Sequence, residues 1–178
     1  MGYASFGEVT RLDADALRAL LVGGEAPERV WAAWALGVRH DRTFERELRA
    51  TAAEEPDAGV RRHLLVVLAG AGEATSVMTL AMHDPDERVR ATALQYVARL
   101  APPKHADAHD LLARVLSEGA PALCLRCISG LRSDAPSAVW NAVEDCVASP
   151  DPELRWAAYE AIMRISRSTS LMTTPMEA

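Results

Sequence analysis

The sequence has few aromatic residues, few cysteines and no long apolar run. Aromatic side chains make up 5% of the 178 residues and cysteines number three. Sheets are rich in aromatic and β-branched residues, so this composition, with its abundant alanine and leucine, favours packed helices. No apolar stretch reaches the roughly 18 residues that a membrane helix needs. The start lacks a basic segment followed by an apolar one, and no secreted disulfide pattern is present, so a reducing, cytoplasmic location is expected.

The chain also lacks the short motifs that mark common catalytic sites. No phosphate-binding loop, dinucleotide fingerprint, zinc-protease helix motif or serine nucleophile elbow occurs in it. The net charge of −6 argues against a dedicated nucleic-acid binder, which usually has a basic balance. The sequence therefore predicts no catalytic residue, metal or cofactor, and its length suits one domain.

A repeat is present instead. The stretch DPDERVRATALQYVARL at 84–100 returns in altered form as PDPELRWAAYEAIMRI at 150–165. An aliphatic residue that follows each proline-rich turn serves as an anchor, and the anchors are Val30, Val60, Val89, Leu123 and Leu154. The residues four positions later are Trp34, Leu64, Ala93, Cys127 and Ala158, and those eight positions later are Val38, Leu68, Val97, Leu131 and Ile162. Offsets of four and eight lie on one face of an α-helix, so each anchor marks a helix with a buried face.

Each anchor helix is preceded by a second helical stretch and a breaker that contains proline. The predicted hairpins span residues 12–40, 41–70, 72–101, 104–133 and 135–166. Asp57, Asp86 and Asp151 stand where an N-cap is expected. Because one hairpin cannot bury both of its helices, this pattern predicts an all-α fold, an α-solenoid in one domain over 12–166. Residues 1–11 are expected to form a cap or a flexible segment, and residues 167–178 a flexible tail.

The stretches at 84–100 and 150–165 resemble HEAT-like repeats, in particular those of short bacterial proteins, and the resemblance covers 12–166. It implies antiparallel hairpins in a right-handed superhelix. It also implies a ladder between neighbouring repeats made by the turn Asp and the Arg four positions later. The pairs concerned are Asp57/Arg61, Asp86/Arg90 and Asp151/Arg155. In the first and fourth repeats the arginine position holds Trp31 and Cys124, so the ladder is expected to be interrupted.

Charge is unevenly distributed between the two helices of each hairpin. The second helices carry more arginines than acidic residues, whereas the first helices and their turns carry an acidic excess. The resemblance implies that second helices line a concave face, which would then be mildly basic. One interpretation is that these arginines serve only the ladder and solvation. The other is a binding site for a protein or an acidic peptide, with Arg29, Arg62, Arg88, Arg126 and Arg155 as ligands and Trp31 and Trp156 as apolar anchors. A non-catalytic adaptor with such a site is the predicted function.

Other interpretations stay open. Some HEAT-like proteins are alkylation-repair DNA glycosylases, and Trp31, Trp156, Tyr159 and Glu160 would be the residues for such a nucleic-acid-binding enzyme. Others are bilin lyases, but no residue of this chain singles out a bilin site. Self-association through the last hairpin is a third possibility.

Cys124 and Cys127 form a CxxC pair, but zinc needs four ligands. The nearest candidates, His105 and His109, are displaced along the antiparallel helix, so packing is the predicted role of Cys127.

Overall fold

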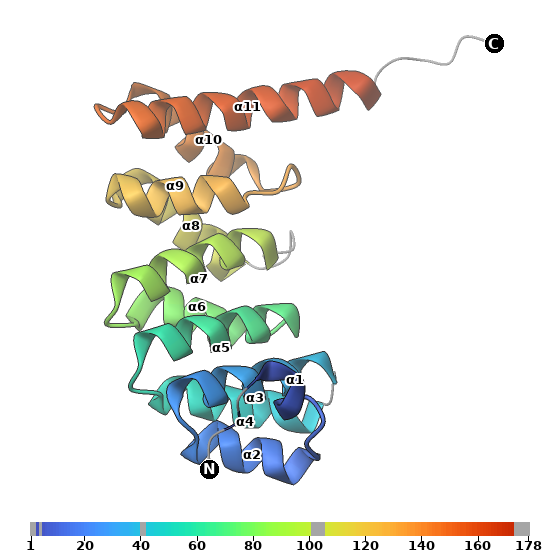
Figure 1. Cartoon of the computed structure of the whole chain (residues 1–178). Helices are drawn as coiled ribbons and strands as arrows, with labels where there is room; N and C mark the ends of the chain where they lie inside the picture. The colour runs from blue at the N-terminus through green and yellow to red at the C-terminus, as the bar shows by residue number, and fades with distance from the viewer. Residues whose placement is uncertain (1–2, 4, 40–41, 101–105, 173–178) are drawn as a thin grey trace, which may run out of the picture. The chain divides into compact units, whose positions relative to one another are not determined.

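The computed structural model describes residues 3, 5–39, 42–100 and 106–172, and this part of the chain is helical and contains no strand (Figure 1). The prediction of an all-α fold is confirmed. The α-helices are α1 (Phe6–Val9), α2 (Ala14–Gly23), α3 (Ala26–Val38), α4 (Arg42–Glu54), α5 (Ala58–Gly70), α6 (Ala74–His83), α7 (Glu87–Leu100), α8 (Ala106–Glu118), α9 (Pro121–Gly130), α10 (Ser137–Asp145) and α11 (Pro152–Met172), and a short 3-10 helix, η1, covers Cys146–Ala148.

The chain divides into two compact units, residues 1–96 and residues 97–178. In the first unit α2 packs against α3, α3 against α5, and α5 against both α4 and α6. The short helix α1 packs on α3. Leucines fill the space between the helices, and Leu17, Leu36, Leu64 and Leu65 are each almost fully buried. The first unit is thus built from helix pairs that share one apolar core.

In the second unit α8 packs against α9 and α10, and α11 packs against α9, α10 and η1. Its core uses smaller side chains, among them Cys127, Val139, Val143 and Ala158, which are fully buried. Helix α11 continues to Met172, into the segment predicted as a tail, and residues 173–178 lie outside the described residues. The single-domain boundary at 12–166 and the superhelical arrangement of the whole chain stay predictions.

The second helices begin where the sequence pattern predicts. The carboxylates of Asp57, Asp86 and Asp151 accept hydrogen bonds from the backbone N–H groups of Val60, Val89 and Leu154, at 2.8–3.2 Å. These bonds satisfy donors that the first turn of a helix leaves without an intrahelical acceptor. The predicted N-cap role of all three aspartates is confirmed.

The anchor register holds in three helix pairs and fails in the first. Val60, Val89 and Leu154 are buried, as predicted, but Trp34 is 36% exposed and Val38 is 69% exposed. Helix α3 has Glu25 as its N-cap, and the residue three positions later is Glu28, whose carboxylate accepts the N–H of Glu25 at 2.9 Å. In the other helices the aliphatic anchor stands three residues after the N-cap, but in α3 this position holds the capping residue Glu28. The predicted anchor, Val30, therefore lies two residues too late. The core positions of α3 are instead Ala32 and Leu36, both buried.

The contact between α3 and α5 depends on a residue without a side chain. A Cβ atom added to Gly37 would meet Cγ1 of Val67 at 2.5 Å, whereas nothing lies within 4 Å of a Cβ added to Gly70. Gly37→Ala is therefore expected to lower the free energy of unfolding by about 1–2 kcal/mol through overpacking. Gly70→Ala, the matched control, should leave it unchanged or raise it slightly. Chemical denaturation measures both, and equal stability of the two variants would contradict this account of the contact.

Candidate functional site

Three turns between paired helices share one construction. They are Glu55-Pro56-Asp57, Asp84-Pro85-Asp86 and Ser149-Pro150-Asp151. In each, a side-chain oxygen of the first residue accepts the N–H of the aspartate two positions later, at 2.9–3.2 Å. The carbonyl groups of the first residue and of the proline accept two hydrogen bonds from one nitrogen, Nη1, of an arginine in the following helix, at 2.7–3.0 Å. These arginines are Arg61, Arg90 and Arg155. Each turn therefore binds its own arginine.

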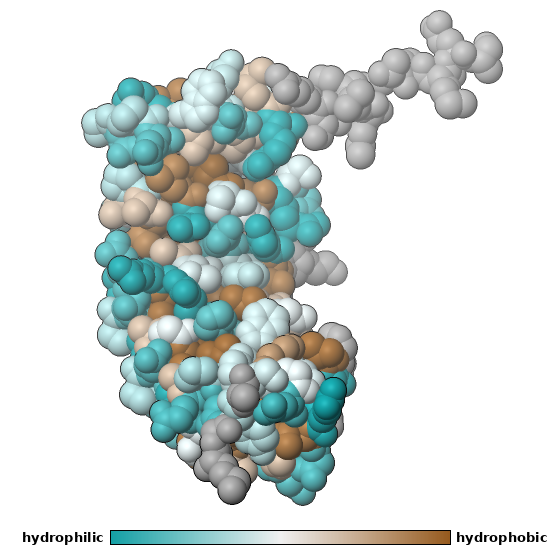
Figure 2. Space-filling model, viewed as in Figure 1, coloured by the Kyte–Doolittle hydropathy of each residue, from teal (hydrophilic) through white to brown (hydrophobic). Residues whose placement is uncertain are grey.

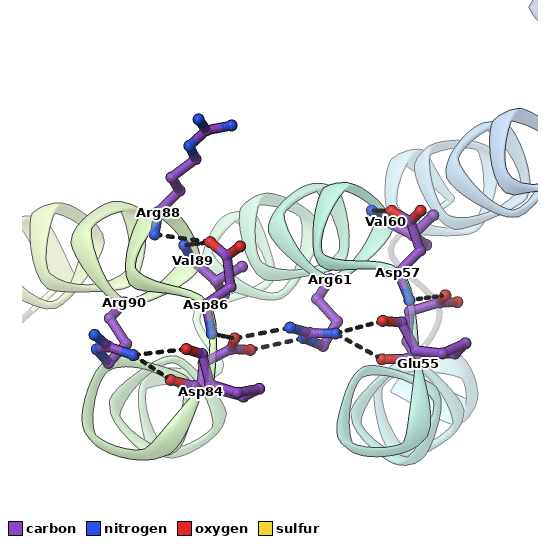
Figure 3. Close-up of polar contacts among 11 residues, drawn as sticks. Glu55, Asp57, Val60, Arg61, Asp84, Asp86, Arg88, Val89 and Arg90 are labelled. Carbon is purple, nitrogen blue, oxygen red and sulfur yellow. Dashed lines mark hydrogen bonds and ion pairs between the residues drawn. The ribbon is translucent and has the colours of Figure 1, made fainter.

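The other edge of the guanidinium group reaches the next helix pair. Nε and Nη2 of Arg61 donate to the two carboxylate oxygens of Asp84 at 2.8 and 2.9 Å (Figure 3). The pair is buried, with the Asp84 side chain 1% exposed. These hydrogen bonds raise the pKa of Arg61. The resemblance implied that the aspartates at 57, 86 and 151 supply the ladder, but the ladder carboxylate of this pair is Asp84, two residues before an N-cap.

Arg29 occupies the same place in the first helix pair. Its Nη1 donates to the carbonyl of Gly24 at 2.8 Å, and its Nε and Nη2 donate to both carboxylate oxygens of Glu55 at 2.8 Å. Like Asp84, Glu55 opens the turn of the next pair. The spacing of the anchors predicts Trp31 at this ladder position, but the N-cap of α3 is Glu25, so the position four residues later is Arg29. Arg29 is thus engaged in an internal ion pair, although it was predicted as a ligand for a partner.

The ladder is interrupted at Cys124, as expected. This residue stands four positions after the α9 N-cap, where Arg29, Arg61 and Arg155 stand in their helices. Its thiol donates to the carbonyl groups of Val115 and Gly119 at 3.2 and 3.5 Å. The turn of the next pair opens with Ser149 in place of an acidic residue. This junction therefore lacks both charges, so neither is left buried without its counterion.

The CxxC pair does not form part of a metal cluster in the described part of the chain, where no group of three or more His, Cys, Asp and Glu side chains is placed to hold an ion. Cys124, Cys127 and Cys146 are free thiols and all three are buried. Of the two histidines considered as partners, His109 is buried on α8 and His105 lies outside the described residues. Desolvation by burial raises the pKa of Cys124 to about 11 and that of Cys127 to about 12.

The remaining candidate residues lie at the surface. Arg62 on α5, Arg88 on α7 and Arg126 on α9 are exposed, and none of their guanidinium groups forms an ion pair with the residues that the structure describes. In Figure 3 the side chain of Arg88 points away from the turns that bind Arg61 and Arg90. Trp31 is half-buried on α3 and Trp156 is 62% exposed on α11. The surface arginines are thus distinct from the ladder arginines.

Sequence reasoning missed two features of these surfaces. Trp34 and Val38 were assigned to the core, but they are exposed beside Trp31 on α3. The ladder acids Glu55 and Asp84 were treated only as part of the breakers. A signal for the ladder was available, because an acidic residue, a proline and an aspartate stand six, five and four positions before both Arg61 and Arg90.

The Arg61–Asp84 pair predicts a large loss of stability when one charge is removed. Asp84→Asn leaves the Arg61 guanidinium buried without its counterion, and the free energy of unfolding should fall by about 3 kcal/mol. Arg132 and Asp134 form an exposed pair, so Arg132→Gln should leave stability unchanged. Urea unfolding of both variants provides the measurement. A near-neutral Asp84→Asn variant would show that this pair does not hold adjacent helix pairs together.

The buried thiols predict slow chemical labelling of the native chain. At pH 8 the raised pKa values keep Cys124 and Cys127 protonated, and the thiolate is the reactive form. An aromatic disulfide reagent should therefore modify the native chain slowly at pH 8 and modify all three thiols quickly in denaturant. Because the folded state holds these protons to a higher pH than an unfolded thiol does, stability should fall as pH rises above about 9. Rapid labelling of native protein at pH 8 would show that the thiols are accessible.

Within the described residues no helix is both long enough and apolar enough to cross a membrane. Comparisons of the chain with protein-family models, with curated proteins and with solved structures found no match. A functional proposal for this chain therefore rests on its own residues.

Proposed function

We propose that the chain is a non-catalytic scaffold that binds an acidic segment of a partner protein, and that its helix pairs are HEAT-like repeats of an α-solenoid. The repeated turn supports the architectural part of the proposal. In the first unit the turns that open with Glu55 and Asp84 each bind their own arginine and aspartate N–H and also receive the arginine of the preceding pair, so these helix pairs are held at a similar offset. A fixed offset between equivalent units is what generates a solenoid.

The binding part of the proposal concerns the exposed side of the second helices in the first unit. Arg62 lies on α5, Arg88 on α7, and Trp31 and Trp34 on α3, which packs against α5. The observation that carries the proposal is that Arg62 and Arg88 are exposed without an ion pair to any described residue, while Arg29 and Arg61 are paired internally. Two cations without counterions on α5 and α7, together with two partly exposed tryptophans on the neighbouring helix α3, suit a ligand that offers carboxylates and an apolar side chain.

The surface itself is mixed in character. Figure 2 shows hydrophilic and hydrophobic side chains interspersed on the face that it displays, without one continuous apolar area. Such a surface is typical of non-obligate protein interfaces, in which charge sets orientation and a few aromatic residues provide most of the affinity. In the second unit Arg126 on α9 is a further exposed cation of the same kind. The ladder arginine Arg29 is not part of this proposed surface.

The test uses a short poly-glutamate peptide with one large apolar side chain at its centre. The double variant Arg62→Glu and Arg88→Glu should weaken binding of this peptide by about tenfold, equivalent to about 1.4 kcal/mol. The control is Arg46→Glu with Arg114→Glu, because these exposed arginines lie on the first helices α4 and α8 and the change in net charge is the same. Calorimetric titration at low salt provides the affinities.

Equal losses in the two double variants would show that only net charge matters, and the surface proposal would then be wrong. The same proteins should be titrated with single-stranded and duplex DNA of matched charge. Tight, steeply salt-dependent binding of DNA that Arg62→Glu and Arg88→Glu abolish would replace the protein-binding proposal with the nucleic-acid alternative.

A further inference from the structure

The exposed side of α11 corresponds to the sides of α3 and α5 that face another helix pair. The correspondence follows from the arginine four positions after each N-cap, which is Arg29 in α3, Arg61 in α5 and Arg155 in α11. Arg29 binds Glu55 in the turn before α5, and Gly37, eight residues further along α3, lies against Val67 of α5. This side of α3 is therefore its contact with the next pair.

The residue four positions after the arginine lies on this same side of each second helix, so its exposed fraction shows whether another helix pair covers that side. In the earlier second helices, including α9 with its cysteine, these residues are Ala33, Leu65, Leu94 and Ile128, and their exposed fractions are between 0% and 4%. The equivalent residue of α11 is Tyr159, which is 50% exposed. Its ring lies 6.1 Å from that of Trp156, between ring centroids. The position that is buried in four helices is open in the fifth.

The same side of α11 forms an open depression of about 530 Å³, lined by Val147, Pro152, Arg155, Trp156 and Tyr159. Three of these residues, Val147, Trp156 and Tyr159, are large apolar side chains that are at least 40% exposed. A cluster of large exposed apolar side chains around one arginine is typical of a protein contact.

Arg155 forms hydrogen bonds within the described chain through only one edge of its guanidinium group. Nη1 donates to the carbonyl groups of Ser149 and Pro150, as Nη1 of Arg61 does to its own turn. No described residue accepts a hydrogen bond from Nε or Nη2 of Arg155, the edge with which Arg29 and Arg61 bind a carboxylate. The turn thus holds Arg155 in the ladder orientation, with its carboxylate-binding edge directed outward.

We infer that α11 docks a helical hairpin of another protein, and that the turn of that hairpin carries an aspartate or glutamate that binds Arg155. The apolar depression receives the second helix of the hairpin, and the carboxylate sets its position along α11, as Asp84 does for Arg61. This docking surface is separate from the surface of Arg62 and Arg88 and does not depend on it.

A second copy of this chain in head-to-tail contact is a poorer occupant. Its first turn has Gly23 two positions before the N-cap Glu25, where the ladder requires an acidic residue. Helix α3 is also partly covered by α1, because α1 packs on it, Val9 is fully buried and the N–H of Tyr3 donates to Glu28 at 2.8 Å. Among the described residues, α1 therefore packs on α3, whereas no described helix covers the Tyr159 side of α11.

The test supplies such a hairpin and measures its contact with α11. A second copy of residues 72–100, which carries Asp84-Pro85-Asp86, is joined to the end of the full chain by a flexible glycine-serine linker. The linker gives the hairpin a high effective concentration at α11. Val147→Cys in the original chain places a reactive thiol in the depression, and Val22→Cys on α2, where valine is 80% exposed, is the matched control site. Labelling by a maleimide at neutral pH reports on both sites, because the three natural thiols are buried.

Docking should slow labelling at Val147→Cys by at least about fivefold and leave labelling at Val22→Cys unchanged. Arg155→Gln in the original chain, or Asp84→Asn in the added copy, should each restore fast labelling. Circular dichroism of each protein checks that the added segment is helical. A second probe, a copy of residues 42–100 with Glu55→Gln as its control, covers the case in which the single hairpin does not fold.

Unchanged labelling with both probes would overturn the inference. Protection that survives both Arg155→Gln and Asp84→Asn would also overturn it, since the contact would then not depend on the carboxylate. Protection of Val147→Cys in the unextended chain that grows with protein concentration would assign the surface to a second copy instead.

Discussion

A buried arginine needs acceptors for its hydrogen-bond donors, and this requirement organises the helix pairs in the first unit of this protein. Four of the five N–H donors of Arg61 bind two carbonyl groups of its own turn and both carboxylate oxygens of Asp84 in the next turn. A guanidinium group with fewer acceptors would carry an uncompensated desolvation cost. One side chain therefore fixes the shape of the turn before its helix and the position of the pair that follows.

The packing of the helices follows from that position. Arg29 and Arg61 hold Glu55 and Asp84 of the following turns. The side of α3 and α5 that carries the arginine therefore packs against the next helix pair. Small or aliphatic residues must then occupy it, and Ala33, Leu65 and Gly37 do so. Where the arginine is replaced by Cys124, the next turn opens with Ser149 in place of an acidic residue, and the thiols of Cys124 and Cys146 both lie against the carbonyl group of Leu116. Charge and packing therefore change together along the chain.

The sequence was sufficient to predict the helices, the N-caps and the burial of Val60, Val89 and Leu154, because a period of four residues and an aspartate before it are local signals. It was insufficient for α3, where Glu28 holds the position of an apolar anchor and Trp34 was consequently placed in the core. The carboxylates of the ladder were also missed. Glu55 and Asp84 bind arginines 23 to 26 residues earlier, so the repeated acid-proline-aspartate pattern marks the turns but does not say which arginine each acid binds.

The role of an arginine in this chain depends on its position relative to the turn. Arg61 and Arg62 are adjacent in sequence, but one residue rotates a side chain by about 100° around the helix. The first therefore faces the turn and the next pair, and the second faces solvent. In α11 the same two positions hold Arg155 and Trp156: Trp156 is exposed, as Arg62 is, and Arg155 is exposed because no described residue binds its outer edge. Arginine content alone therefore cannot identify a binding surface here. Only an arginine whose donors lack internal acceptors is available to a partner, and this criterion separates Arg62, Arg88 and one edge of Arg155 from Arg29 and Arg61.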